Sequence, residues 1–485
     1  MSNKLKNIIL LSTFVISFLM HFQHFSKDLM SIHVWRQTQT QSTTINFYEG
    51  DMNIFTPQRN DRGDTEGIFR MEFPLMQWLI ACLYKVFGNY LIVSRCFMFV
   101  IGIFSVLGMY KLLNELFSNT TLSVMGAWAF NFSPSFYYYT INPLPDNLAL
   151  CCSIWGLAMF FGWYTNKKII NLILCGLLLS IGALCKLPFI IYFIAPIVYF
   201  LSQIFEKGLN GRVLAEFFSV MSFSVLPIMW YVKVIPQWEG NPIVKGMFDS
   251  KESISKLLDY YQHNLVSTLP ELLLNYGSLI FFIAGFYFLI KKRTYTDPRF
   301  VIIISLCTLA TVFYLFEANA IAKIHDYYLF PFYPMLFMLV SYGAYNLFKS
   351  GKKFNRYLTI GLIIILPFTC YLRMQNRWNP NAPGFNKDLL DYKIELQNAV
   401  PNDALVVAGN DESHFIFFYY IDKKGWGYHN DNLSSDNLKI MIEKGAEYLY
   451  TDSENLFRDK EIEFYLDKLI LEKGTIRIYK LKSLL

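Results

Sequence analysis

The segment at residues 28–78 holds the densest set of side chains that could perform chemistry. If the block around residue 33 is helical, four polar side chains fall at i, i+3, i+4 and i+7 and share one face: His33, Arg36, Gln37 and Thr40. A base, a cation, an amide and a hydroxyl would then lie along one stripe. We interpret this stripe as part of a site. The alternative is a solvated amphipathic helix that lies on a bilayer.

Two glutamates follow in the same segment, Glu66 in Asp-Arg-Gly-Asp-Thr-Glu and Glu72 in Arg-Met-Glu-Phe-Pro. Both belong to the same dense polar set as the stripe around residue 33. Together with His33 they are of the types that bind metals, but their spacing matches no known metal site. The residue types would allow a divalent ion, and we predict that none is needed.

Single polar residues at the ends of apolar runs form a second group of candidates: Arg95, Asp146, Lys186, Lys323, His325 and Asp326. Ionisable side chains at membrane depth are costly and usually face a cavity. Each one alone could instead be a snorkelling cation or a helix cap, and Asp146, which follows a proline, could be an acid favoured by the helix dipole. Together they predict an outward-facing cavity that holds carboxylate and ammonium groups. Such a cavity suits an anionic lipid phosphate.

The composition places these candidates in a membrane protein. Of the 485 residues, 54% are hydrophobic and only 16% are charged, whereas a soluble protein of this length would carry far more charge. Repeated apolar runs of about twenty residues indicate a polytopic α-helical membrane protein. The net charge of +6 is therefore not a signal for nucleic-acid binding. The eight cysteines lie in apolar stretches without CxxC spacing, so we predict small buried side chains rather than disulfides or a zinc site.

Eleven transmembrane spans are predicted from the apolar runs. They cover residues 7–22, 93–112, 120–140, 145–164, 168–185, 188–204, 212–233, 273–290, 299–316, 327–348 and 356–372. Every alternate loop is basic, from Lys111 to the cluster at 349–356, which places these loops and the N-terminus in the cytoplasm. The first outer loop, at 25–92, then lies outside, and its run at 73–88 is short and amphipathic enough to be a surface helix.

Residues 373–485 have a different character, and an odd number of spans places them outside the membrane. Strands are predicted within PNDALVVAGND, FIFFYYIDKKGWGYH, AEYLYTDSE and TIRIYKLK, and helices near 386–399, 434–444 and 459–470. The chain therefore divides into a transmembrane domain at 1–372, which includes the first outer loop, and a small soluble α/β domain at 373–485. The small domain could recruit an acceptor, support a lid or cap the fold.

The order and spacing of these motifs resemble those of the GT-C membrane glycosyltransferases, the group that contains protein O-mannosyltransferases and lipid A aminoarabinose transferases. The resemblance covers nearly the whole chain. It rests on the polar first outer loop, Glu-Phe-Pro-Leu at 72–75, Asp146, Lys-Leu-Pro at 186–188, His-Asp-Tyr-Tyr-x-x-Pro at 325–331 and Lys-Lys-Gly-Trp at 423–426. It implies a GT-C bundle that moves a sugar from a polyprenyl-phosphate carrier to a lipid, glycan or protein acceptor. The reaction would occur on the outer face of the cytoplasmic (inner) membrane.

The resemblance also implies roles for the candidate residues. In the family an aspartate of the first outer loop is the general base, and His33 stands at the corresponding place here. Either His33 is the base, since histidine titrates near neutral pH, or Glu66 or Glu72 supplies a carboxylate, or the sequence belongs to a branch of the family with altered chemistry. Asp146 is grouped with the catalytic residues, and binding of substrate and phosphate is assigned to Arg36, Gln37, Arg95, Lys186, Lys323, His325 and Tyr328. A single inverting displacement needs neither a covalent nucleophile nor a cofactor.

Two other functions fit parts of the sequence. An O-antigen polymerase or ligase would be expected to use arginines in large outer loops, but the cations at 235–272 are Lys245, Lys251 and Lys256. A transporter would commonly show inverted repeats, and we find none in the sequence. The polar residues are concentrated on the outer side of the predicted topology, which favours the transferase.

Overall fold

The computed structural model describes residues 1–208, 210–238, 246, 252–323, 325–429, 432–458 and 460–483. Lys245 and Lys251 lie outside the described residues, as do the last two residues of the chain. The chain forms two units that interleave in sequence. The helical unit comprises residues 1–26, 71–73 and 94–375, and the mixed unit comprises residues 27–70, 74–93 and 376–485. Most of the first outer loop is thus grouped with the C-terminal region, and not with the spans as the division at residue 372 assumes.

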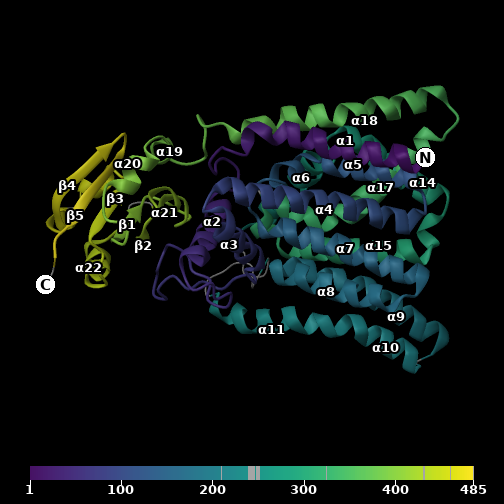
Figure 1. Cartoon of the computed structure of the whole chain (residues 1–485), viewed down its shortest axis with the longest axis horizontal. Coiled ribbons are helices and arrows are strands. Elements are labelled where there is room, and N and C mark those ends of the chain that lie inside the picture. Colours follow the sequence, from purple (N-terminus) through teal and green to yellow (C-terminus); the bar gives the residue numbers. More distant parts are fainter. Residues whose placement is uncertain are drawn as a thin grey trace. The chain divides into compact units, whose positions relative to one another are not determined.

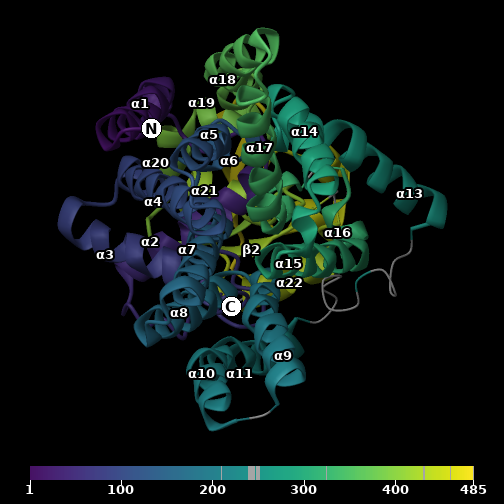
Figure 2. The same cartoon turned by 90° about the vertical axis from the view of Figure 1, so that its right-hand side faces the viewer.

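α-Helices of ten residues or more, most of them apolar, make up the bulk of the helical unit. They are α1 (Asn3–His21), α4 (Leu91–Phe117), α5 (Thr120–Asn131), α7 (Pro145–Asn166), α8 (Ile169–Cys185), α9 (Ile194–Lys207), α10 (Gly211–Met221), α11 (Val225–Val234), α13 (Ile254–His263), α14 (Gly277–Lys291), α15 (Pro298–Phe316), α17 (Tyr333–Phe348) and α18 (Lys353–Met374). Most run roughly parallel, with α1 and α18 at one side and α10 and α11 at the other (Figures 1 and 2). Leu19, Met229 and Ile364 are each at least 65% exposed, as expected for a surface that faces lipid rather than water.

Each of the eleven predicted spans coincides with a helix or with consecutive helices. Seven helices among the described residues are long and apolar enough to cross a membrane, and the bent pair Ile254–Leu273 and Gly277–Lys291 would be an eighth span. The predicted spans at 120–140 and 327–348 are broken, because α5 is followed by α6 (Pro134–Tyr139) and η8 (Asp326–Phe332) precedes α17. Eleven transmembrane spans are therefore reached only if helices that are too short to cross a membrane alone are also counted.

Two of the proline-containing 3₁₀ segments within the helical unit directly follow candidate residues. Segment η2 (Leu187–Phe193) joins α8 to α9, and η8 leads into α17. Pro188 and Pro331 lack the N–H that an α-helical hydrogen bond requires, so the chain tightens or bends around them. The hydroxyl of Tyr192 donates to the carbonyl oxygen of Pro331 at 3.0 Å and ties the two segments together. Lys186 and His325 directly precede these segments, so their local positions follow from the breaks.

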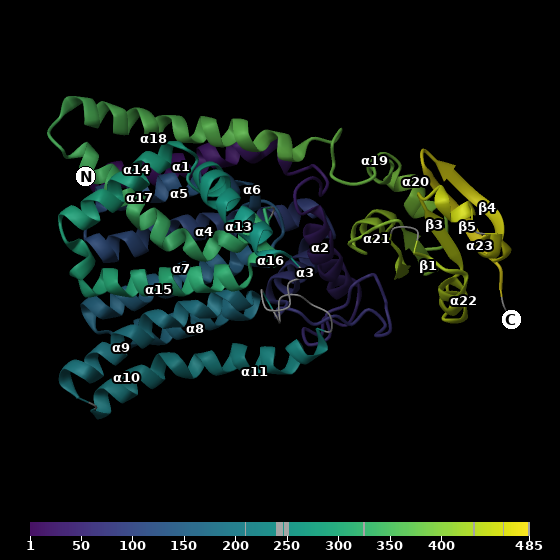
Figure 3. The same ribbon diagram turned by 180° about the vertical axis from the view of Figure 1, so that it is seen from behind.

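Five strands form the sheet of the mixed unit, in the order β2-β1-β3-β5-β4. Strands β1 (Leu405–Gly409), β2 (Lys424–Gly427) and β3 (Tyr448–Thr451) run parallel, and β4 (Leu466–Lys473) and β5 (Ile476–Leu481) complete the sheet as an antiparallel hairpin. Successive residues of β1 point to opposite faces, so Val406 and Val407 belong to different core clusters. Helices α19 (Lys387–Asp391), α20 (Lys393–Asn398) and α21 (Ile416–Ile421) pack on one face, and α22 (Ser435–Glu443) and α23 (Lys460–Phe464) pack on the other (Figure 3).

The first outer loop is built into this unit. It contains α2 (Val34–Glu49) and α3 (Leu75–Phe87), the latter at the predicted surface helix. Leu29 and Val34 are buried in the same core cluster as α19, α20 and α21. Residues 60–62 also form an isolated parallel bridge to β2, because the amide of Gly425 donates to the Asn60 carbonyl at 3.0 Å and the amide of Arg62 donates to the Gly425 carbonyl at 2.7 Å. The loop and the C-terminal region therefore share one core, and the bridge ties the loop to the edge of the sheet.

Two of the C-terminal predictions are wrong in part. Residues 416–421, predicted as strand, form α21, because an unbroken apolar run does not by itself distinguish a strand from a buried helix. Asp411 and Ser413 fix its start, since their side chains accept hydrogen bonds from the amides of Phe417 and Ile416 at 2.9 and 3.3 Å. Residues 466–470, predicted as helix, belong to β4, which pairs with β5 across a turn in which Gly474 has a φ of +57°.

The prediction for the cysteines holds for five of the eight. Cys151, Cys152, Cys175, Cys185 and Cys370 are buried, Cys82 and Cys307 are half-buried, and Cys96 is exposed, and all eight are free thiols. Cys96 lies on an outward face of α4. Because lipid tails are as apolar as the protein core, a small apolar side chain on a transmembrane helix is equally stable facing lipid or facing the protein.

Candidate active site

A cavity of about 300 Å³ lies within the helical unit. Its volume falls within the range of small-molecule sites, and apolar side chains dominate its lining. Four lining residues could do chemistry: Glu72, Lys186, Glu317 and Tyr328. The remaining lining residues are Met71, Leu187, Pro188, Ile190, Ile191, Tyr231, Ile235, Trp238, Phe313 and Phe316. Three of the four chemical residues were predicted from the sequence, and the cavity brings them together although they lie far apart along the chain.

Glu72 reaches the cavity because the residues on either side of it are fixed to the helices. The amide of Phe73 donates to the Leu184 carbonyl at 2.9 Å, and the indole N–H of Trp230 donates to the Met71 carbonyl at 3.1 Å. The rings of Phe73 and Trp230 also meet edge to face, with centroids 5.0 Å apart. The carboxyl of Glu72 is therefore presented from a short segment that is held at both ends.

Lys186 is the cation of the cavity. Its Nζ lies 3.6 Å from Oδ2 of Asp146, in the first turn of α7, where the helix dipole favours a negative charge. The same ammonium lies over the rings of Tyr327 and Tyr328, at 5.7 and 5.0 Å from their centroids. Both members of the ion pair are largely buried. A carboxylate and two aromatic faces thus keep a positive charge in a place with little water.

Glu317 was missed by the sequence analysis. It is the first residue after α15, it is only 2% exposed, and its Oε2 has no hydrogen-bond partner among the described residues. Burial raises the pKa of this carboxyl to about 7, although the nearby charge of Lys186 opposes the rise. The signal was available, because Glu317 is a single acid directly behind an apolar run, the criterion that selected Asp146 and Lys186.

His325 and Asp326 lie beside the cavity rather than among its lining residues. The ring of His325 meets those of Tyr327 and Tyr328 edge to face, at centroid distances of 5.7 and 5.8 Å. Burial lowers the pKa of His325, although two backbone hydrogen bonds oppose the change. Asp326 accepts hydrogen bonds from the hydroxyls of Ser135 and Tyr139. These contacts fix the segment that carries Tyr328.

Two predicted binding residues have other local roles in the structure. Arg95 is fully buried, and its Nη1 donates to the Ile141 carbonyl at 3.2 Å and to Oδ1 of Asn142 at 2.8 Å. It therefore links α4 to the turn before α7. Lys323 is partly exposed, with its Nζ 2.6 Å from Oδ2 of Asp259. Neither residue is among those that line the cavity.

The predicted stripe at residues 33–40 belongs to the mixed unit. Helix α2 begins at Val34, so Arg36, Gln37 and Thr40 are helical as predicted, whereas His33 is the N-cap residue, with a left-handed φ of +56°. Non-glycine residues at positive φ are uncommon and often lie at functional sites. Arg36 donates to the amide oxygen of Gln39, and Gln37 donates to the Ile32 carbonyl at 3.0 Å. These bonds are local and hold the first turns of α2.

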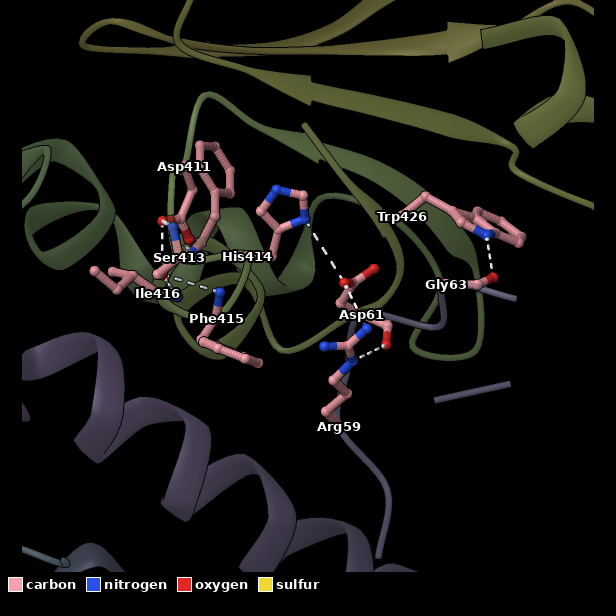
Figure 4. Close-up of polar contacts among 10 residues, drawn as sticks. Arg59, Asp61, Gly63, Asp411, Ser413, His414, Phe415, Ile416 and Trp426 are labelled. Atoms are coloured by element: carbon pink, nitrogen blue, oxygen red, sulfur yellow. Dashed lines mark hydrogen bonds and ion pairs between the residues drawn. The ribbon is translucent and has the colours of Figure 1, made fainter. Parts of the chain in front are cut away.

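The loop that carries Glu66 is fastened to the C-terminal region (Figure 4). Asp61 lies between Arg59, at 3.4 Å, and His414, whose Nδ1 is 3.6 Å from Oδ2 of Asp61. The indole N–H of Trp426 donates to the Gly63 carbonyl at 3.1 Å. The side chain of Glu66 itself is 84% exposed and lies 3.9 Å from Arg62. Of the two glutamates predicted as bases, only Glu72 lines the cavity.

The described residues contain no group of three or more His, Cys, Asp or Glu side chains placed to hold a metal ion. The cavity instead combines one ammonium, two carboxyls and two phenols with a long apolar wall. Such a donor set could bind an anionic head group beside an apolar chain and could accept a proton.

Residues 72–231 match the family model of the dolichyl-phosphate-mannose-protein mannosyltransferases. The match spans Glu72 and Lys186, which line the cavity, and Asp146, which pairs with Lys186. The fold is similar to that of ArnT from Cupriavidus metallidurans in the apo state, with a TM-score of 0.67 at 12% sequence identity over 98% of this chain and 97% of that one. The chain therefore has the fold of the GT-C membrane glycosyltransferases.

Further GT-C structures show the same likeness. ArnT from Cupriavidus metallidurans bound to undecaprenyl phosphate aligns with a TM-score of 0.65 at 10% identity, over 99% of this chain and 98% of that one. The oligosaccharyltransferase of Archaeoglobus fulgidus aligns with a TM-score of 0.62 at 11% identity, over 100% of this chain and 75% of that one. At such low identities the likeness is one of fold. No curated protein matches the chain in sequence.

Proposed function

We propose that this protein transfers a sugar from a polyprenyl-phosphate donor to a lipid, glycan or protein acceptor on the outer face of the cytoplasmic membrane. The observation that carries the proposal is the position of Lys186 in an otherwise mainly apolar cavity. The family model of residues 72–231 and the ArnT structure with bound undecaprenyl phosphate support the same class of donor.

Lys186 would bind the phosphate of the donor and stabilise the charge that develops on it as it leaves. The ion pair with Asp146 favours the charged form of the lysine, and the two tyrosine rings restrict its position. A charge that is already in place before the reaction lowers the barrier without the cost of reorganising solvent. The apolar wall would accept the first isoprene units. A single displacement of this kind needs neither a metal nor a covalent intermediate.

Glu72 is the better placed of the two glutamates to take the proton of the acceptor. It lines the cavity together with Lys186, whereas Glu66 is exposed in the mixed unit. His33 is the competing base, since it occupies the place of the family aspartate and has a strained backbone conformation. In the proposed topology the N-terminus is cytoplasmic, and the mixed unit lies outside, where an acceptor would arrive.

The test is transfer in vitro by the purified full-length chain in detergent or liposomes. A panel of polyprenyl-phosphate sugars would serve as donors, with loss of the donor and release of polyprenyl phosphate as readouts. Lys186→Met should lower the rate by about 10²–10³-fold, the usual cost of losing one group that stabilises a developing charge. Lys256→Met is a matched control, because Lys256 pairs with Glu252 on an exposed helix. No transfer from any donor, or equal rates for both variants, would count against the proposal.

A further inference from the structure

Glu317 is a buried acid that lines the cavity and whose Oε2 has no hydrogen-bond partner among the described residues. The residue is only 2% exposed. Its backbone, in contrast, is fully engaged, because the amide donates to the Phe313 carbonyl and the carbonyl accepts from Ala320 and Ile321. The fold therefore sets the position of Glu317, while its Oε2 stays unpartnered within the part of the chain that the structure describes.

Such a carboxyl is costly to maintain. Burying a polar group without a hydrogen bond destabilises a protein, and natural proteins rarely retain such a group unless it has a use. Glu317 also follows the C-terminus of α15, where the helix dipole disfavours a negative charge. Neither side-chain packing nor helix capping explains why a glutamate is present at this buried position. A ligand that brings a hydrogen-bond donor into the cavity would satisfy it.

The chemistry of the donor identifies this ligand. A polyprenyl-phosphate sugar has three parts, of which the isoprenoid carries no hydrogen-bonding group and the ionised phosphate only accepts hydrogen bonds. Lys186 in the same cavity already supplies a cation for the phosphate. Within the donor, only the sugar, with its ring hydroxyls, offers hydrogen-bond donors to a carboxyl oxygen. We propose that Glu317 binds the hydroxyls of the donor sugar and so distinguishes the sugar-loaded carrier from the free carrier.

This inference rests on the proposed function, since it assigns the parts of one donor to neighbouring groups. Lys186 would hold the phosphate and Glu317 the sugar, which fixes the anomeric carbon between them. Burial raises the pKa of Glu317 to about 7, so the carboxyl is partly neutral at physiological pH and does not strongly repel the phosphate beside it. Glu317 is thus a binding residue that sets specificity, and it takes no part in proton transfer.

The experiment compares two ligands on the full-length chain in detergent: undecaprenyl phosphate and the same carrier loaded with mannose, glucose or arabinose. Affinities are measured for the wild-type chain, Glu317→Leu and Glu317→Gln. The wild-type chain should bind one loaded carrier more tightly than the free carrier, and Glu317→Leu should lose about tenfold in affinity for it, as expected for one or two hydrogen bonds. Its affinity for undecaprenyl phosphate should stay unchanged, and Glu317→Gln should recover part of the preference. Leucine suits the buried position, and Glu216→Leu, which removes an acid paired with Arg212, is a matched control.

The outcomes separate the two proposals. If the wild-type chain prefers a loaded carrier and Glu317→Leu keeps that preference, the inference about Glu317 fails and the proposed function stands. If Glu317→Leu weakens binding of the free and loaded carriers equally, Glu317 shapes the cavity and does not recognise the sugar. If the wild-type chain binds no carrier at all, the proposed function fails, and the inference fails with it.

Discussion

Replacing Glu317 with glutamine should change how the stability of the protein depends on pH. The pKa of Glu317 is raised from 4.5 to about 7 in the folded chain, chiefly by burial. A shift of this size corresponds to about 3 kcal/mol of unfavourable interaction of the charged form. Below pH 4.5 the carboxyl is protonated in both the folded and the unfolded chain, so this cost is absent. The free-energy cost of the buried charge grows as the pH rises from 4.5 to about 7, and above pH 7 it is constant. The free energy of unfolding of the wild-type chain therefore falls between pH 4.5 and 7.

Glutamine has nearly the same shape and cannot ionise. Glu317→Gln should therefore lack this decline, and its apparent Tm should exceed that of the wild-type chain by several degrees at pH 8, with the difference shrinking toward pH 5. Thermal unfolding of both proteins in one detergent, at intervals from pH 5 to 8, measures the difference directly. Both proteins contain the other ionisable groups around the carboxyl, which are Glu72, Lys186, His325 and Tyr328. The contributions of these groups to the pH dependence of Tm therefore cancel, to first order, in the difference between the two proteins. Parallel curves across the whole range would refute the assignment of Glu317 as a buried, ionisable acid.

Three further predictions concern the cavity and the bundle. Asp146→Ala removes a buried partner of a lysine and should lower the free energy of unfolding by about 3 kcal/mol, as measured by chemical denaturation. Glu72→Gln should lower transfer in vitro by about 10²–10⁴-fold, the usual contribution of a general base, and should do so more strongly than Glu66→Gln; the reverse order would move the base to the exposed loop. Gly285→Ala should destabilise the contact between α14 and α17 by about 1–3 kcal/mol, because its new Cβ would lie 2.0 Å from the Leu339 carbonyl oxygen. Gly361→Ala, with nothing within 4 Å, should leave the apparent Tm unchanged or raise it slightly.

Glu317 has a stability cost that a glutamine would not have, and this cost is consistent with its proposed role. Groups that bind a substrate are often held in environments that the folded protein alone would not favour, so stability and activity are traded against each other. If Glu317→Gln is more stable than the wild-type chain at pH 8 and binds the sugar-loaded carrier less tightly, Glu317 lowers stability and increases substrate recognition at the same position.

Part of the site could be predicted from single residues. Asp146 and Lys186 were selected because ionisable groups at the ends of apolar runs are costly, and they form an ion pair in the structure. The same reasoning selected Lys323, which pairs instead with Asp259. The cost of burial says that a charge must have a partner, but it does not say whether that partner is another side chain or a ligand.

The sequence by itself determined the class of the protein, its apolar helices and most of its candidate residues. These follow from the length and periodicity of apolar runs, which depend only on near neighbours in the chain. Only the tertiary structure decided which residues meet. It placed Glu72 at the cavity and left Glu66 exposed, and it joined residues 60–62 to the edge of β2. It also left Oε2 of Glu317 without a hydrogen-bond partner among the described residues. The physical reason is that cavities, edge pairings and unpaired buried groups arise from contacts between segments that are distant in the chain. Local sequence patterns carry no information about such contacts.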